Sequence, residues 1–415
     1  MNNEHKENTG FEIKAAEGGV CAPKGFTAAG ISCGIKNNES KDLALIAGDC
    51  LCAAAAVYTS NKVKGAPLEV TRRNIADGRA QAVICNSGNA NTCAPGGEKL
   101  AEDVCALTAE ALGIKKEDVV VSSTGVIGQE LSLEPFKEGI PRLKEGLGKE
   151  GGKDAAEAIL TTDTRRKSIA VEFNAGGKVC RMGGMAKGSG MVNPNMATML
   201  SFITTDADIS PQLLQRALSE TVKDSFNQIS VDGDTSTNDM VVILASGRAG
   251  NSIIEKEGKD FDVFSSALRE VSVFLSRELA RDGEGATKLI ECLVENAPDR
   301  EMARAVSKSV ISSDLLKAAV FGEDANWGRV LCAIGYTEGD FSVENIDVDM
   351  ESSRGRVTVC RESRHKEYSE EKAAEVLSAD EIKIRVNMNQ GSESASAWGC
   401  DLSYDYVRIN GDYRT

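Results

Sequence analysis

Residues 182–200 read MGGMAKGSGMVNPNMATML. Four glycines surround Lys187, and Pro194 comes shortly before an Ala-Thr pair. Because glycine has no Cβ, such a stretch can bring the backbone close to another backbone or to a ligand. Composition alone favours a flexible loop that leads into a strand. A phosphate-binding loop is excluded, because the GxxxxGK[ST] order is absent and Lys187 precedes its glycine.

The flanking sequence predicts a mixture of strands and helices. After the glycine-rich stretch, residues 196–210 predict a buried strand, and Ser210 and Pro211 suit the N-cap and first position of a helix that runs to about residue 226. Before it, residues 81–85 (QAVIC) predict another buried strand, and residues 97–112 carry apolar side chains at helical spacing. Further helices are predicted over residues 154–160, 261–281 and 300–320, and further strands over residues 117–128, 343–349, 355–360, 382–388 and 400–409. Because regular βαβ periodicity is missing, we expect a layered α/β (α+β) sandwich in which helices cover sheets.

Composition and charge narrow the class of protein. The chain has 415 residues, 63 of them acidic and 48 basic, for a net charge of -15. Such a surface repels nucleic-acid phosphates and anionic lipids, so we expect neither nucleic acid nor a membrane as a partner. The most apolar stretch, residues 43–59, contains Asp49 and is too short to span a bilayer. The first ten residues are polar and lack the apolar core of a signal peptide, which favours a cytoplasmic protein.

Histidine and cysteine usage excludes several kinds of site. The two histidines, His5 and His365, lie in polar or charged stretches, whereas a catalytic imidazole needs a sheltered place. A histidine-rich metal site is equally disfavoured, and we predict neither a metal nor a cofactor. The 12 cysteines are scattered without a CxxC pair. We expect them to be buried, reduced thiols.

The segment KGSGMVNPNMATML resembles the self-cleavage segment of the ornithine acetyltransferase (glutamate N-acetyltransferase) family. The resemblance continues in order along about residues 11–415. It is carried by NSGNANTC, SSTGVIG, TTDT, SVDGDTSTND, DGEGATKLIE, FGEDANWGRV and the C-terminal WGCDLSYDYVRINGDYRT. Several of these motifs are weak alone, but together they are specific. The resemblance implies the layered α/β fold that this family shares with the self-cleaving β-peptidyl aminopeptidases.

The resemblance also implies that the chain cuts itself between Ala197 and Thr198. The products would be an α chain, residues 1–197, and a β chain, residues 198–415, which begins with the nucleophile Thr198. A threonine hydroxyl is a poor nucleophile without a base. The α-amino group that the cut releases titrates near pH 8, with a typical pKa of about 7.7–8.0, and can serve as that base. This chemistry suits a chain without a sheltered histidine.

Two further groups of site residues follow from the resemblance. Thr124 and Gly125, in SSTGVIG, match the family's oxyanion pair, although from the residues alone they form a strand-ending turn. The positions that match the family's substrate contacts are Thr161 or Thr162, Lys187, Thr198, Glu284, Asn410 and Thr415. The charge of Lys187 suits a substrate carboxylate, and Glu284 would face an amino group of the substrate.

The implied reaction is acetyl transfer from N2-acetyl-L-ornithine to L-glutamate, through an acetyl-threonine intermediate in a ping-pong cycle. The implied assembly is a heterotetramer of two α and two β chains. The sequence leaves open whether acetyl-CoA is a second acetyl donor. Two alternatives remain. The first is an N-terminal-threonine amidohydrolase or aminopeptidase that passes the acyl group to water, and the second is an uncut, non-enzymatic binding protein.

Overall fold

The structure is a computed structural model that describes residues 11–193 and 199–412. Its larger sheet contains nine described strands, in the order β1-β6-β7-β8-β10-β3-β4-β5, with β2 paired to β3. These strands are β1 (Lys14–Ala16), β2 (Phe26–Ile31), β3 (Leu43–Tyr58), β4 (Arg79–Asn89), β5 (Val119–Val126), β6 (Lys167–Ala175), β7 (Lys178–Lys187), β8 (Leu200–Thr205) and β10 (Met240–Ala245). The sheet therefore combines strands from both sides of residues 194–198.

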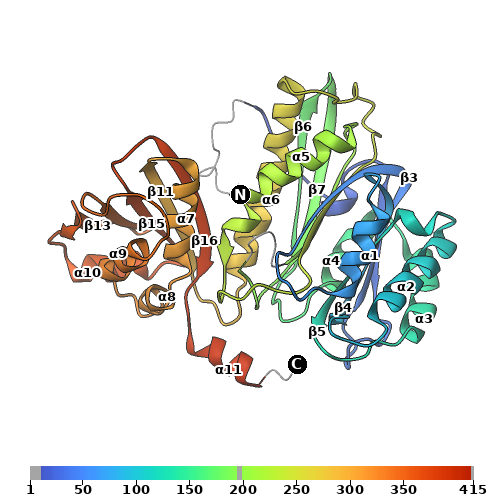
Figure 1. The fold of residues 1–415 in the computed structure, drawn as a ribbon, viewed down its shortest axis with the longest axis horizontal. Helices are drawn as coiled ribbons and strands as arrows, with labels where there is room; N and C mark the ends of the chain where they lie inside the picture. The colour runs from blue at the N-terminus through green and yellow to red at the C-terminus, as the bar shows by residue number, and fades with distance from the viewer. Residues whose placement is uncertain (1–10, 194–198, 413–415) are drawn as a thin grey trace.

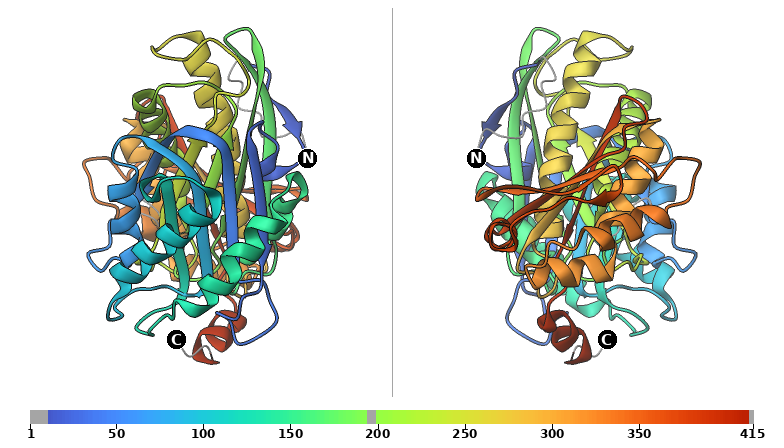
Figure 2. Two further views of the ribbon diagram at one scale, coloured as in Figure 1. Left: turned by 90° about the vertical axis from the view of Figure 1, so that its right-hand side faces the viewer. Right: turned by 90° about the vertical axis from the view of Figure 1, so that its left-hand side faces the viewer.

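Strand β3, with 16 residues, belongs to two layers of this sheet. Its pairing with β4 loses register between Ala47 and Cys52, and the strand bends over in this region (Figure 2). Before the bend it pairs with β2 and β4. After the bend, Cys52 and Ala53 still pair with the start of β4, and residues 53–58 pair with β10. The bend therefore folds the sheet into two facing layers with an apolar core between them.

Alternation along each strand fills the cores on both sides of a layer. In β10, Met240, Val242 and Leu244 pack into the core between the layers. Val241 and Ile243 pack outward, against α5 (Pro211–Thr221) and α6 (Lys259–Arg281). The other outer face is covered by α1 (Ala66–Asn74), α2 (Gly97–Leu112) and α3 (Glu134–Gly146) (Figure 1). The expected layered α/β sandwich is thus confirmed, as four layers with helices outside.

The smaller sheet lies entirely in the second half of the chain, with the order β14-β13-β12-β15-β11-β16-β9. Its strands are β9 (Ile229–Ser230), β11 (Leu289–Ala297), β12 (Asp347–Ser352), β13 (Gly355–Arg361), β14 (Arg364–His365), β15 (Glu381–Asn387) and β16 (Glu393–Cys400). The helices that follow its strands are α7 (Arg300–Ile311), α8 (Asp314–Phe321), α9 (Trp327–Gly335) and α10 (Glu370–Leu377). They share one apolar core with this sheet. Helix α6 contacts both β6 and β16, so it lies between the two sheets (Figure 1).

Most elements predicted from the sequence are present, but two are wrong. The predicted helix 97–112 is α2, and the Ser210 hydroxyl accepts a hydrogen bond from Leu213 N (3.4 Å) at the start of α5. The single helix predicted over residues 300–320 is interrupted, because the Ser313 hydroxyl caps a new helix by accepting a hydrogen bond from Leu316 N (3.3 Å). These residues form α7 and α8 instead.

The strand predicted over residues 400–409 is also wrong. Strand β16 ends at Cys400, because the Asp401 carboxylate turns back and accepts hydrogen bonds from the backbone N–H groups of Thr287 and Lys288 (2.8 and 2.9 Å). The chain then forms α11 (Tyr404–Asp412), in which no residue is buried. The alternating pattern of this segment does not by itself make a strand, since there is no neighbouring ladder at this point among the described residues.

All 12 cysteines fall within the described residues, and all are free thiols. Ten are at least partly buried, as expected, whereas Cys93 and Cys332 are exposed. No helix in residues 11–193 and 199–412 has both the length and the apolar character needed to cross a membrane.

Candidate functional site

The ends of four strands, β5, β7, β8 and β10, meet at one end of the larger sheet. Strand β5 ends just after Thr124 and Gly125, and β7 ends at Lys187. Leu200, the first residue of β8, pairs with Lys187 on one side and with Met240 of β10 on the other. At this end of the sheet β7 ends at Lys187, where the glycine-rich segment begins, and β8 starts at Leu200.

Thr124 and Gly125 occupy a crowded turn at the end of β5. Gly125 has a φ of +130°, and a Cβ at this position would lie 2.4 Å from the backbone carbon of Gly88 in β4. Only glycine combines this conformation with so close an approach of two backbones. The β4–β5 register breaks at the same point, where Asn89 pairs with both Thr124 and Val126. The local geometry suits either a strand-ending turn or a pair of oxyanion donors.

Lys187 links this turn to a set of buried charges. Its ammonium group donates a hydrogen bond to the Thr124 hydroxyl (Nζ–Oγ1 3.3 Å) and lies 3.9 Å from Oδ2 of Asp163. Asp163 also accepts hydrogen bonds from Gly188 N (2.7 Å) and from Lys167 Nζ (2.7 Å). Lys167 in turn lies 2.5 Å from Asp282 Oδ2. Two lysines and two aspartates, all nearly inaccessible to solvent, thus balance in charge next to Thr124.

The environment of Asp163 keeps its side chain ionised. Burial alone raises the pKa of this carboxyl group. The opposing effects of the Lys187 and Lys167 charges and of the hydrogen bonds from Lys167 and Gly188 outweigh burial, so the pKa is held well below its ordinary value. Asp163 therefore holds Lys187 in place as a charged group aimed at Thr124.

The chain after Lys187 is held by backbone contacts on both sides. Ser189 donates its hydroxyl hydrogen bond to the carbonyl of Asp282 (2.6 Å), and its own carbonyl accepts from Glu284 N (2.9 Å). Further along, the Asp232 carboxylate accepts hydrogen bonds from the backbone N–H groups of Met191 and Val192 (2.6 and 2.9 Å). The approach to the predicted cleavage junction is thus fixed up to the last residues before position 194.

Glu284 and Asn410 form a second polar cluster beside this segment. Asn410 Nδ2 donates to Glu284 Oε2 (2.8 Å), which ties α11 to the loop after α6. A Cβ on Gly190 would lie 2.3 Å from the same carboxylate oxygen. Because Gly190 has no side chain, there is room for the Glu284 carboxylate, which lies against the glycine-rich segment that follows Lys187.

Asp239, directly before β10, is a buried carboxyl group of the opposite character to Asp163. It is 2% exposed, and its Oδ2 atom has no hydrogen-bond partner among the described residues. Burial raises its pKa well above the ordinary value. Hydrogen bonds with Ser236, Thr59 and Met199 N and the charge of Lys187 only partly oppose this effect. A buried carboxyl group with a raised pKa therefore lies beside the first residues of β8.

The structure brings together most of the residues predicted from the sequence. Thr124, Gly125 and Lys187 form one cluster, and Glu284 and Asn410 form the other. Thr161 and Thr162 are half-buried in the turn before Asp163, whose Oδ2 accepts a hydrogen bond from Thr161 N (3.1 Å). The remaining predicted site residues lie outside the described residues, and these are Ala197, Thr198 and Thr415.

Sequence reasoning missed the residues that hold these clusters. Asp163, Asp282 and Asp239 were within motifs that carried the resemblance, TTDT, DGEGATKLIE and SVDGDTSTND, but no role was assigned to them. The available signal was two lysines in apolar or glycine-rich stretches, Lys167 three residues after TTDT and Lys187 in the glycine-rich segment. In a core, a lysine needs a carboxylate partner, and this requirement could have singled out the aspartates.

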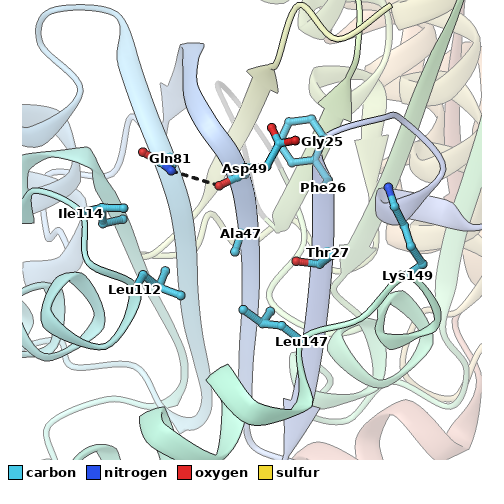
Figure 3. A pocket seen from close by; sticks show the side chains of 11 residues that line it. Gly25, Phe26, Thr27, Ala47, Asp49, Gln81, Leu112, Ile114, Leu147 and Lys149 are labelled. Atoms are coloured by element: carbon cyan, nitrogen blue, oxygen red, sulfur yellow. Dashed lines mark hydrogen bonds between the residues drawn. The ribbon is translucent and has the colours of Figure 1, made fainter.

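A separate hollow of about 320 Å³ lies far from these residues. It is located at the bend of β3, between Ala47, Asp49, Gln81, Leu147 and Lys149 (Figure 3). The site residues instead gather where β5 and β7 end. Within residues 11–193 and 199–412, no group of three or more histidine, cysteine, aspartate or glutamate side chains is arranged to hold a metal ion.

Comparison with known proteins shows which family this chain resembles along its length. The family model described as the ArgJ family matches residues 27–415. The arginine biosynthesis bifunctional protein ArgJ of Caldanaerobacter subterraneus subsp. tengcongensis is 49% identical over 406 residues, which cover 97% of this chain and 100% of that protein. The arginine biosynthesis bifunctional protein ArgJ 1 of Clostridium acetobutylicum is 47% identical over 391 residues, or 94% of this chain and 96% of that protein.

A solved structure is also similar. The crystal structure of the arginine biosynthesis bifunctional protein from Bacillus halodurans shares 48% identity and a TM-score of 0.50, and the match covers 52% of this chain and 100% of the solved chain. The two relatives from Caldanaerobacter and Clostridium match this chain at 47–49% identity over 94–97% of its length. The chain therefore belongs to the ArgJ family.

Proposed function

We propose that this protein is a glutamate N-acetyltransferase of arginine biosynthesis. In the first half-reaction, the Thr198 hydroxyl attacks the acetyl carbonyl of N2-acetyl-L-ornithine. The amide C–N bond breaks, the proton passes to the leaving amine, and ornithine departs from an acetyl-threonine ester. In the second half-reaction, the amine of L-glutamate attacks this ester, which gives N-acetyl-L-glutamate and restores the Thr198 hydroxyl.

The main observation behind this proposal is that Thr124, Gly125 and Lys187 lie together at the end of the sheet where β8 begins. A tetrahedral intermediate needs donors that are in place before charge develops on its oxygen. The close packing of Gly125 against β4 supplies a rigid backbone, and Lys187 adds a fixed positive charge beside Thr124. Removal of one such donor typically costs about 10²–10³-fold in kcat.

The two polar clusters support recognition of an amino acid. Lys187 suits a substrate carboxylate, and the Glu284 carboxylate suits an ammonium group. Both lie along the same glycine-rich segment, since Gly188 N contacts Asp163 and Ser189 O contacts Glu284 N. Ornithine and glutamate each present a carboxylate and an amino group, which fits one positive and one negative partner.

A self-cut between Ala197 and Thr198 would complete the site, because the new α-amino group of Thr198 would act as its base. The half-length match to the solved chain supports this step, since a cut near position 197 leaves chains of about half the full length. We further propose that two α and two β chains assemble as a heterotetramer in the cytoplasm, without a bound cofactor, and that acetyl-CoA serves as a second acetyl donor.

The test is the denatured mass of the untagged protein, combined with an acetyl-transfer assay. The wild-type chain should give two masses that sum to the full chain plus one water, and it should form N-acetylglutamate from N-acetylornithine and glutamate. Thr198→Ala should stay uncut and inactive. Thr198→Ser, which keeps a hydroxyl group, is the matched control and should still be cut and active.

Two outcomes would contradict the proposal. Cleavage and activity in Thr198→Ala would remove the nucleophile from its role. Release of free acetate from N-acetylornithine, with no dependence on glutamate, would assign the same site to an amidohydrolase.

A further inference from the structure

Asn238, two residues before β10, makes four hydrogen bonds through its side chain. Its Nδ2 group donates to the carbonyl oxygens of Ala90 (2.6 Å) and Ser123 (3.0 Å). Its Oδ1 atom accepts from the hydroxyl groups of Thr92 (2.5 Å) and Thr237 (2.6 Å). These bonds use the two donors and the two acceptor positions of the amide. Asn238 is only 5% exposed, so water cannot replace them easily.

The partners of Asn238 lie at the turn that carries the oxyanion pair. Ser123 directly precedes Thr124, and the Ser123 carbonyl belongs to the same rigid peptide plane as the Thr124 N–H. Ala90 follows the end of β4, and its N–H donates to Val126 O (2.9 Å) just beyond Gly125. One side-chain amide therefore ties together the ends of the parallel strands β4 and β5, which approach each other closely at Gly125.

Asn238 also belongs to the element that positions the start of β8. Met240 N donates to Met199 O (3.0 Å), and β10 then runs parallel to β8 from the Met240–Leu200 pair. The residue thus connects two parts of the site. One is the end of β5, in the first half of the chain, and the other is the β8–β10 pair, in the second half.

The Asn238 amide is held against Gly65 on another side. A Cβ at Gly65 would lie 2.5 Å from Asn238 Nδ2, and the three atoms nearest to it all belong to this amide. Gly65 has φ -64° and ψ 139°, a conformation that alanine adopts readily. Alanine at position 65 would therefore displace the Asn238 amide without straining its own backbone.

We infer that Asn238 is a positioning residue that holds the Thr124-Gly125 turn in place relative to the strand pair where the nucleophile chain begins. The inference rests on the proposed function. After the proposed cut, three of its four partners would belong to the α chain and Asn238 to the β chain. The oxyanion pair of one chain would then be placed by a residue of the other.

The test compares kcat and KM for acetyl transfer in Asn238→Ala and Gly65→Ala. Displacement of reacting groups by about 1 Å can cost on the order of 10²-fold, so kcat should fall about 10- to 100-fold while KM stays within about twofold. Asn251→Ala is the matched control. Asn251 is 6% exposed and makes three side-chain hydrogen bonds near Asp208, beyond the opposite ends of β8 and β10. Its kcat should be unchanged.

A double-mutant cycle with Thr124→Ala separates positioning from a general loss of stability. If Asn238 acts by positioning Thr124 and Gly125, the double variant should lose less kcat than the product of the losses in Asn238→Ala and Thr124→Ala. The inference is overturned if the kcat values of Asn238→Ala and Gly65→Ala equal that of Asn251→Ala. It is also overturned if the fold-loss of kcat in a double variant with Thr124→Ala equals the product of the two single losses. A wild-type chain that transfers no acetyl group overturns the proposed function, and with it this inference.

Discussion

The Asp163 carboxylate balances the positive charges of the buried Lys167 and Lys187. Replacing it with a neutral residue should show how much this balance contributes to stability. Asp163→Asn leaves Lys167 and Lys187 without their shared carboxylate, so the free energy of unfolding should fall by about 3–5 kcal/mol at pH 7. The pKa of Asp163 is depressed in the folded chain. Its stabilising contribution is therefore present above the unfolded pKa, about 3.9, and is lost as pH falls through the folded value. Urea unfolding of both proteins at pH 7 and below pH 4 should show the difference narrowing in acid.

Asp49 provides the control for this measurement. Asp49 pairs with Arg248 at 2.9 Å, and both side chains are about half exposed. Because surface ion pairs contribute little, Asp49→Asn should leave stability almost unchanged at every pH. An equal effect of the two substitutions would show that Asp163 does not compensate buried charge.

Asp239 should show the opposite dependence on pH. Its pKa is raised in the folded chain, chiefly by burial, so its contribution to stability is greatest below the unfolded pKa, about 3.9, and is lost as pH rises toward the folded value. Asp239→Asn cannot ionise in either state. The substituted protein should therefore be more stable than the wild type at pH 8 and equal to it near pH 4. Greater stability of the wild type at pH 8 would mean that the carboxylate is charged and compensated.

Single residues of the site could be predicted only where the resembling motif assigns a role to that position. Thr124, Gly125 and Lys187 follow from local sequence once the family resemblance is recognised. Asp163 and Asn238 do not, although both lie within quoted motifs. Their roles depend on partners that are distant in sequence, such as Lys187 for Asp163 and Ser123 for Asn238. Aspartate or asparagine in a turn has the same local signature whether or not such partners exist.

At the scale of the element, helix α6 carries buried serine side chains, Ser272 and Ser276, in its second half. The Ser276 side chain is fully buried, and its hydroxyl has no hydrogen-bond partner among the described residues. A buried hydroxyl without a partner is destabilising, so Ser276→Ala should raise the free energy of unfolding by about 1 kcal/mol. Thermal or urea unfolding at pH 7 would measure this gain.

Ser266 on the same helix is the matched control. Its hydroxyl donates to Asp262 O (2.8 Å) near the surface, and Ser266→Ala brings the same gain in helix propensity, about 0.5 kcal/mol. The difference between the two substitutions therefore isolates the burial of the hydroxyl group. A smaller gain at Ser276 than at Ser266 would show that the buried hydroxyl is satisfied.

Elements with a strong local signal were predicted well, and those that depend on neighbours were not. Helix α2 has regular apolar spacing over its whole length, and α5 has a capping serine and a first-turn proline. Residues 400–409 alternate like a strand, but β16 ends at Cys400 and residues 404–409 belong to α11, because Asp401 turns back to residues 287 and 288. The bend of β3 also depends on pairing with two different partners, which the apolar run 43–59 does not reveal.

At the scale of the whole molecule, the larger sheet interleaves the two halves of the chain. Strands β8 and β10, from the second half, lie between β7 and the later part of β3, from the first half. Six residue pairs join β7 to β8, and six more join β10 to β3. One apolar core also contains residues from both sides of the proposed cut, such as Phe173 and Ile203. A cut between residues 197 and 198 therefore breaks one peptide bond but leaves these ladders and this core in place.

The cut protein should consequently behave as one folded unit. Separation of the chains would expose the unpaired edges of β7 and β3 together with an apolar core, and both exposures are unfavourable. Gel filtration of cut protein, diluted to nanomolar concentration, should therefore recover both chains in one peak, and thermal unfolding should show a single transition. The uncut Thr198→Ala protein should unfold in one transition of similar cooperativity. An α chain that elutes alone without denaturant, or that unfolds cooperatively when expressed by itself, would show that residues 1–197 need no strands from the second half.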